Sequence, residues 1–375
     1  MYSEISSLLP GIKRVDESSL EMLGSPVFEL GLERMFSAKV ESIKLMCDRL
    51  TLMDVHPALC VFRKSLGSSR FNYLLRSSKA FLLGDRLRAV DEIFRSTLEA
   101  IANVKMSDFS WDQASLPLSF GGIGVRKVED IAMPAYLSSV YSTLELSSEI
   151  LRKFSFQVIE TSVLELIEEI PRDFVPEGDE KKKKQKNWDL PMIKSKFDEM
   201  FDSSEPVARA RLLASSTKES SKWLQVVPSS QLGLLLDNNS ARIAVGLRLG
   251  SGLCEEHKCV CGGMVQKDGL HGLSCKMKIK KIAAHDEVNK VFSHAFSSAG
   301  FPTMLQPPAF ETLGCMGPET KKFIEKLGKI IKATSGEPRS MDYLLQKISI
   351  AIQRGNAACI LGTLGTDRVD DFYVL

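Results

Sequence analysis

The chain has 375 residues, 44% of them hydrophobic and 26% charged, which is ordinary for a globular protein and sufficient for two or three domains. Its net charge of +2 and sequence pI of about 8.0 do not by themselves indicate a nucleic-acid-binding protein, so any basic surface must come from local clusters. The sequence contains no apolar run as long as a membrane span and no N-terminal secretory signal. We therefore expect an intracellular protein, in the nucleus or cytoplasm, without a membrane partner.

The first part of the chain has the spacing of amphipathic helices. Apolar residues recur at three- and four-residue intervals over 27–104 and again over 128–146, where Pro134 predicts a kink or a break. A loop with a Gly-Gly turn lies between them at 111–124. The pattern predicts a helical bundle over residues 1–150.

Residues 171–191 contain three prolines, a glycine and a run of charged side chains, and they offer no apolar face to bury. A solvated linker is the expected structure, with a specific RNA contact by the lysines as the alternative. Helices are predicted to resume at 191–203, 205–216 and 239–249. The region 151–250 is thus expected to be a charged linker followed by a helical connector.

The eight cysteines are expected to be thiols or metal ligands rather than disulfides, because the chain shows no secretory signal. Four are scattered singly in apolar helical contexts and are expected to be buried: Cys47, Cys60, Cys315 and Cys359. The other four, with two histidines, fall within one short segment: Cys254, His257, Cys259, Cys261, His271 and Cys275.

This segment has the pattern of a zinc site, since zinc prefers four tetrahedral nitrogen or sulfur ligands, usually as two close pairs joined by a loop. Cys259 and Cys261 form a pair followed by two glycines, and the spacing of His271 and Cys275 places both on one face of a helical turn. We predict that these four residues bind a structural Zn²⁺, worth on the order of 10 kcal/mol to the folding of the module. Because Cys-x-Cys is less common than Cys-x2-Cys, the alternates are Cys254 and His257. A reduced cysteine-rich loop without metal is the other interpretation.

Lysines flank the predicted zinc site and continue into a basic amphipathic helix predicted at 278–299. A zinc-held loop edged with lysines can contact phosphates, although a solvated face is an equal alternative. The zinc module with its helix is placed at 251–300. The residues predicted to contact nucleic acid are Lys258, Lys276, Lys278, Lys280, Lys281, Arg242 and Arg248.

Two apparent catalytic motifs near the C-terminus are interpreted as chance. Val369-Asp370-Asp371 lacks the preceding aromatic residue and the hairpin strands of a polymerase motif. Glu319-Thr320-Lys321 is expected to open a helix, whereas the corresponding nuclease motif lies on a strand. Two helices are predicted here, at 317–335 and 339–357, and no catalytic residue is assigned.

Short blocks along the chain occur in a recognisable order. They are Leu8–Gly11, Leu23–Val27, Arg70–Arg76, Leu116–Leu118, Gly121–Arg126, Arg242–Gly250, His285 after the predicted zinc site, Gly336–Ser340 and Gln353–Ala357. Together they resemble the part that follows the polymerase palm in metazoan non-LTR retrotransposon reverse transcriptases with a restriction-like endonuclease.

This resemblance implies a thumb that grips the template–primer duplex, a zinc knuckle that binds nucleic acid, and an endonuclease that nicks DNA. The sequence departs from the family in two places. The palm with its magnesium aspartates would lie before Met1, and the segment Gln306–Phe310 runs directly into Glu311–Gly314, a point beyond the endonuclease core. We therefore expect residues 301–375 to be a remnant of the endonuclease region together with the two C-terminal helices, with residual α/β structure.

The expected fold is mainly α, a multi-domain, thumb-like helical bundle with a small zinc-binding module. The expected function is RNA or DNA binding by a transposon-derived fragment without polymerase or nuclease activity. A helical scaffold or interaction protein that binds no nucleic acid is the alternative. The sequence does not specify an oligomeric state.

Overall fold

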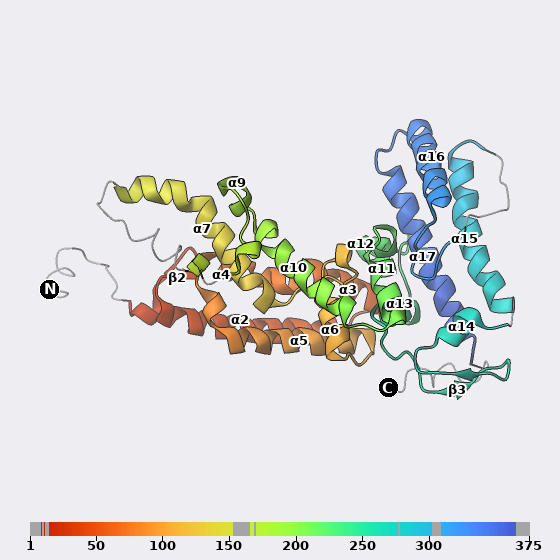
Figure 1. Ribbon diagram of the computed structural model, residues 1–375, viewed down its shortest axis with the longest axis horizontal. Helices are drawn as coiled ribbons and strands as arrows, with labels where there is room; N and C mark the ends of the chain where they lie inside the picture. Colours follow the sequence, from red (N-terminus) through yellow and green to blue (C-terminus); the bar gives the residue numbers. More distant parts are fainter. Residues whose placement is uncertain are drawn as a thin grey trace. The chain divides into compact units, whose positions relative to one another are not determined.

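The computed structural model describes residues 9, 11, 15–152, 166–168, 170–276, 278–301 and 309–364, with only the backbone of 151–152 and 278–284. This part of the chain is mainly helical, as the apolar periodicity predicted (Figure 1). The α-helices are α2 (Glu29–Leu50), α3 (Val55–Val61), α4 (Asn72–Ser77), α5 (Gly84–Ala102), α6 (Asp108–Ser115), α7 (Val128–Arg152), α9 (Asp179–Lys182), α10 (Gln185–Asp202), α11 (Pro206–Ser216), α12 (Lys222–Gln225), α13 (Asn238–Leu249), α14 (Leu270–Ser274), α15 (Lys278–Ser298), α16 (Pro318–Ser335) and α17 (Ser340–Leu361).

The strands of the described residues form two short antiparallel hairpins. In the first, β1 (Glu21–Met22) pairs with β2 (Ser25–Pro26). In the second, β3 (His257–Lys258) pairs with β4 (Met264–Val265), with His257 opposite Val265. The second hairpin lies within the predicted zinc module.

The chain divides into two compact units, each made of three separate stretches. The first unit consists of residues 1–46, 69–91 and 128–192, and the second of residues 47–68, 92–127 and 193–375. This division groups residues by contact rather than by order along the chain. The four consecutive regions proposed from the sequence remain a prediction.

In the first unit, side chains of α2, of α4 and of Phe71, which immediately precedes α4, form a core beside α7. The rings of Phe36 and Phe71 lie 5.4 Å apart, and Leu74 and Leu75 are fully buried. Burial of apolar side chains of this size stabilises the fold by about 1.5–3 kcal/mol each. The α4 and α7 helices pack directly against each other.

Asp91 of the first unit fixes the start of α7. Its carboxylate accepts hydrogen bonds from the backbone N–H groups of Val128, at 2.5 Å, and Glu129, at 3.2 Å. These bonds satisfy two of the N–H groups that a helix start leaves without intrahelical partners. The helix then continues past Pro134 to Arg152, so the predicted break at the proline does not occur.

The prediction of a solvated linker over 171–191 is wrong for its second half. Part of the lysine run forms α9, and α10 begins at Gln185. Trp188 is only 2% exposed, and its indole N–H donates to the carbonyl of Lys182 at 2.7 Å. The Trp188 ring lies 5.7 Å from the Tyr141 ring of α7, and the Lys182 ammonium lies 5.1 Å from the centre of the Tyr141 ring. One tryptophan thus anchors a segment whose average composition indicated a solvated loop.

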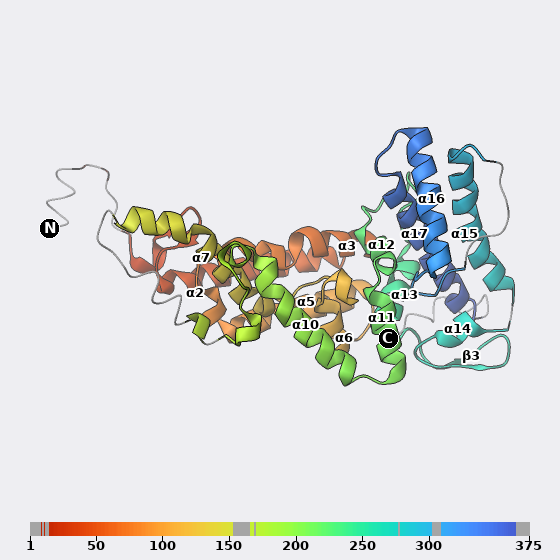
Figure 2. The same ribbon diagram turned by 45° about the horizontal axis from the view of Figure 1, so that its top comes forward.

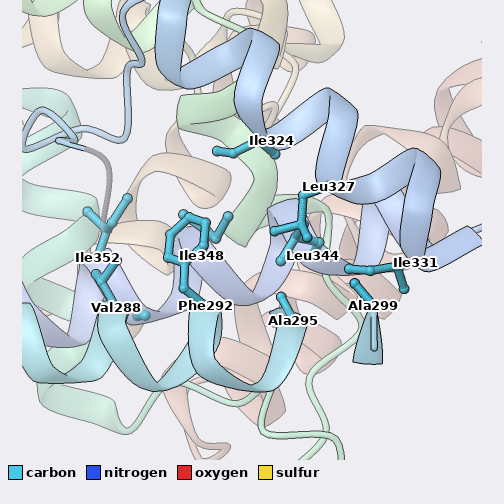
Figure 3. Packing of buried hydrophobic residues seen from close by; sticks show 11 residues of the cluster. Val288, Phe292, Ala295, Ala299, Ile324, Leu327, Ile331, Leu344, Ile348 and Ile352 are labelled. Atoms are coloured by element: carbon cyan, nitrogen blue, oxygen red, sulfur yellow. The ribbon is translucent and has the colours of Figure 1, made fainter. Parts of the chain in front are cut away.

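In the second unit, α17 is the helix on which several others pack. Its contacts include α12, α13, α14, α15 and α16. Figure 3 shows how Phe292 of α15, Leu327 of α16 and Ile348 of α17 meet in one apolar cluster. The six helices predicted from residue 191 onward are confirmed as α10, α11, α13, α15, α16 and α17, with the largest differences at the start of α10 and the end of α17.

The C-terminal region was expected to retain α/β structure, and this prediction is wrong for the part that the structure covers. Residues 309–364 contain the helices α16 and α17 and no strand. Their apolar residues repeat at helical spacing and are buried against α15. Across the described residues, no helix is both long and apolar enough to cross a membrane.

Candidate metal centre

The predicted zinc module is a hairpin followed by a short helix. Cys259 directly follows β3, and Cys261 lies in the turn that leads to β4. The turn is closed by two backbone hydrogen bonds of 2.8 Å, from Cys259 N–H to the Gly263 carbonyl and from Gly262 N–H to the Cys259 carbonyl. His271 lies near the start of α14, and Cys275 follows its last residue. Two segments of chain therefore present two ligand-type side chains each.

The four side chains converge. Sγ of Cys259 lies 3.8 Å from Sγ of Cys275, and Sγ of Cys261 lies 3.3 Å from Nε2 of His271. All four ligand atoms lie within 4.8 Å of one another. This cluster of Cys259, Cys261, His271 and Cys275 can hold a metal ion, and these four residues are the set preferred from the sequence.

The four ligand-type residues differ in exposure and in thiol acidity. Cys259 and Cys275 are buried, His271 is half-buried and Cys261 is exposed. Burial raises the pKa of the Cys259 thiol to about 11, whereas hydrogen bonding from the backbone of Gly263 and from Cys259 lowers the pKa of Cys261 to about 6. The lowered pKa of Cys261 favours its thiolate form, and a bound cation would favour deprotonation of Cys259 as well.

Two glycines allow the segments to approach. A Cβ atom on Gly263 would lie 2.9 Å from Cε1 of His271 and 3.5 Å from Sγ of Cys261. A Cβ atom on Gly272 of α14 would lie 2.8 Å from the Cα atom of Ile360 in α17. Since a side chain fits at neither position, these glycines set the distances between hairpin, α14 and α17.

The module is joined to α13 and α17 by one continuous apolar core. Figures 1 and 2 both show α14 beside the C-terminal end of α17. The buried members of this core are Ile243, Leu247, Leu253, Cys254, Cys259, Val265, Cys275, Ala357 and Ile360. Two of the metal-ligand candidates are thus part of the hydrophobic core, which holds them in place.

No family model, curated protein or solved structure matches the chain.

The alternates Cys254 and His257 lie outside the cluster. Cys254 is 1% exposed, and its thiol donates to the carbonyl of Gln266 at 3.6 Å. The His257 ring has Nδ1 at 2.9 Å from the Glu255 carbonyl and Nε2 at 2.9 Å from the Thr363 hydroxyl. Both side chains therefore have structural partners in this arrangement.

Thr363 is a supporting residue that the sequence did not indicate. Besides its contact with His257, its carbonyl accepts a hydrogen bond from the backbone N–H of Val260 at 3.2 Å. Val260 lies between the two cysteines of the hairpin turn. Roughly a hundred residues separate Val260 from Thr363, so only the tertiary structure could bring this pair together.

Several predicted phosphate-contacting lysines lie near the module. Lys258 and Lys276 are exposed, as is Lys267, whose ammonium lies 3.9 Å from the Glu255 carboxylate. The backbone of Lys278, Lys280 and Lys281 opens α15, but their side chains lie outside the part of the chain that the structure describes. Arg242 on α13 is half-buried and engaged with another residue.

The prediction that Arg248 contacts nucleic acid is wrong, because the side chain is buried in the protein. It is 1% exposed and lies on α13. Burial lowers the pKa of its guanidinium to about 9. The guanidinium donates to the carbonyls of Gly122, Leu118, Ser215 and Ser220 and to the Ser221 hydroxyl. All three guanidinium nitrogens donate to protein acceptors, so Arg248 joins loops of the core and, buried there, cannot reach a phosphate.

The structure describes one of the two motifs that were interpreted as chance matches to catalytic sequences. Glu319-Thr320-Lys321 opens α16, as expected, and Lys321 forms an ion pair of 2.9 Å with Glu219. Val369-Asp370-Asp371 lies outside the described residues.

Proposed function

We propose that this chain is a zinc-dependent nucleic-acid-binding protein derived from the region after the palm of a non-LTR retrotransposon reverse transcriptase. The observation that supports it most is the convergence of Cys259, Cys261, His271 and Cys275. The family resemblance of the short sequence blocks supplies the proposed origin.

Zinc is the metal that fits this donor set best. Three thiols and an imidazole form a typical structural zinc site, whereas magnesium, calcium and manganese prefer oxygen ligands. In a tetrahedral site with a Zn–S bond of about 2.3 Å, two sulfurs lie about 3.8 Å apart and a sulfur and a nitrogen about 3.6 Å apart. The observed distances of 3.8 Å and 3.3 Å are close to both. Bound zinc would hold the hairpin turn against α14.

The proposed nucleic-acid contact uses the exposed lysines of the module. Lys258, Lys267 and Lys276 lie on the chain segments that the metal cluster joins. The ion pair of Lys267 with Glu255 is between exposed groups, and such pairs contribute little stability, so Lys267 is available to exchange its partner for a phosphate. An ordered loop with three cations attracts a phosphate backbone without reading its sequence.

The proposed thumb-like origin of the helical part is supported by where the resembling blocks lie. Phe71 and Leu75, in the first such helical block, are fully buried. Gly122 has no room for a side chain, because a Cβ atom would collide with the Leu116 carbonyl. Gly250 ends α13 with φ of 64°. These positions of three blocks lie where the fold restricts residue type, which supports the proposal that the fold has been inherited.

Nucleic-acid binding before and after disruption of the metal cluster tests the proposed function. We expect zinc-loaded protein to bind a labelled RNA or DNA oligonucleotide at low salt, with affinity that falls as salt rises. Cys261→Ser/His271→Ala should lose at least tenfold in affinity, whereas the matched variant Cys254→Ala/His257→Ala should retain it. Absence of binding by the wild-type protein at low salt would contradict the proposal and favour a helical scaffold.

A further inference from the structure

The outward face of α16 carries a row of lysines that the proposed function has not used. The inner face of this helix, with Ile324, Leu327 and Ile331, is buried against α15 and α17 (Figure 3). At 100° per residue, Lys322, Lys326 and Lys329 fall on the opposite side of the helix. All three are exposed. We call Lys322, Lys326 and Lys329 the lysine stripe.

The α16 helix carries a larger net positive charge than the chain as a whole. The helix has five lysines and two glutamates, a net charge of +3, while the whole chain has +2. Lys322 lies 3.4 Å from Glu319, but both side chains are strongly exposed, so this pair is screened by solvent. Within the described part of the chain, Lys326 and Lys329 have no acidic partner at ion-pair distance. The stripe therefore presents a local positive potential to solvent.

The spacing of the stripe suits a nucleic-acid backbone. Lys322 and Lys329 are separated by about 10 Å along the helix axis, at about 1.5 Å per residue. One strand of a duplex presents about three phosphates over this length, at about 3.4 Å per phosphate along the axis. Three flexible ammonium groups in a row can thus contact successive phosphates.

The stripe lacks the aromatic platform on which unpaired bases stack. Phe323, the aromatic residue of this helix, lies beside the stripe and not in it; its ring is 6.2 Å from Phe292 and 6.0 Å from Phe296, and the residue is 38% exposed. Surfaces specialised for single strands combine cations with exposed aromatic rings. Because the row itself consists of lysines alone, it favours the regular backbone of a duplex.

We propose that the lysine stripe binds the phosphate backbone of double-stranded nucleic acid, as a second contact surface beside the metal module. This inference rests on the proposed function, since it assigns a second contact surface to the same protein. The stripe and the module pack on different parts of α17, the stripe's helix against Leu344 and Ile348 and the module against Ile360. Lysine contacts of this kind are independent of sequence, so the stripe contributes affinity rather than base recognition.

The test uses full-length, zinc-loaded protein with a 20-base-pair DNA duplex, an RNA duplex of the same length and the corresponding single strands. Lys322→Ala/Lys326→Ala/Lys329→Ala should weaken duplex binding by roughly tenfold or more and reduce the slope of log K against log salt by about 2–3. Replacement of the same three lysines by arginine should restore both values. The control Lys105→Ala/Lys194→Ala/Lys218→Ala removes the same charge from exposed positions elsewhere in the second unit and should leave the slope unchanged.

The outcomes separate the stripe from the proposed function. If the stripe variant and the control variant both bind the duplex as tightly as the wild-type protein, the proposed role of the stripe is wrong and the proposed function stands. Loss confined to single strands would overturn the assignment to a duplex. Absence of all binding by the wild-type protein at low salt would overturn both. Thermal unfolding of each variant establishes that a loss of binding is not a loss of folding.

Discussion

Gly263 and His271 approach so closely that a Cβ atom on the glycine would lie 2.9 Å from Cε1 of the imidazole. Seven residues of chain lie between the two positions, and the contact brings the hairpin turn against α14. The glycine is therefore part of the metal centre although it supplies no ligand.

Gly263→Ala should weaken zinc binding. The added methyl group would push His271 away from Cys261, whose Sγ atom now lies 3.3 Å from Nε2. Displacement of a supporting contact typically costs roughly 10–100-fold in metal affinity. Competition with a chromophoric zinc chelator measures the change. Gly252→Ala is the control, because a Cβ atom there meets nothing closer than 4.0 Å, and equal affinities for the two variants would refute this role of Gly263.

The two histidines of the module should respond differently to alanine. His257 bonds to the Glu255 carbonyl and the Thr363 hydroxyl, so His257→Ala should retain zinc and lose about 1 kcal/mol of stability. His271→Ala removes a ligand and should lose the metal. Zinc content and thermal unfolding of the two variants decide this, and zinc loss in His257→Ala would show that the ligands have been assigned wrongly.

Arg248→Met should destabilise the second unit without a direct effect on nucleic-acid contacts. The substitution leaves buried carbonyls of Gly122, Ser215 and Ser220 without their donor, at a cost of at least about 3 kcal/mol in total. Arg209→Met is the matched control, since Arg209 is half-buried and donates to two carbonyls at a helix end. Urea unfolding should show a clearly larger loss for Arg248→Met. If Arg248→Met and the control were equally stable and Arg248→Met bound nucleic acid more weakly, Arg248 would be a nucleic-acid contact and not a structural residue.

His56 makes the stability of the second unit depend on pH. Its Nδ1 atom accepts from the Leu236 backbone N–H at 3.0 Å, Nε2 lies 3.3 Å from the Trp223 carbonyl, and the side chain is 2% exposed. Burial lowers its pKa from 6.5 to about 4, so the unfolded chain binds this proton first as pH falls. The free energy of unfolding should therefore be fully maintained above pH 6.5 and fall between pH 6.5 and about 4, by about 3 kcal/mol in total.

The comparison of wild type with His56→Gln isolates this effect, because acid also protonates the metal ligands of both proteins. The glutamine amide can accept from Leu236 and donate to Trp223 without titrating. The difference in unfolding free energy between the two proteins should change over this pH window. A difference that stays constant from pH 7 to pH 4 would contradict the assignment.

The features that depend on the spacing of residues close together in the sequence were predicted correctly. The apolar periodicity located the helices from residue 191 onward, and the preferred ligand set is the one that converges, because each ligand pair lies within one turn. Features set by distant partners were missed. The sequence suggested that Arg248 could bind phosphates. In the structure its guanidinium instead donates to backbone carbonyls of the loop at 118–122 and of residues 215–220, which are distant in the sequence. Trp188 lies in a charged segment, and its burial involves Tyr141 of α7, a partner distant in the sequence.

The central claim is that Cys259, Cys261, His271 and Cys275 together hold one zinc ion, and metal analysis of the purified protein by mass spectrometry tests it most directly. The account predicts one zinc per chain in the wild-type protein and none in Cys261→Ser/His271→Ala, with Cys254→Ala/His257→Ala still loaded. A wild-type protein that takes up no zinc after exposure to the metal, or a double variant at Cys261 and His271 that keeps its full complement, would contradict it.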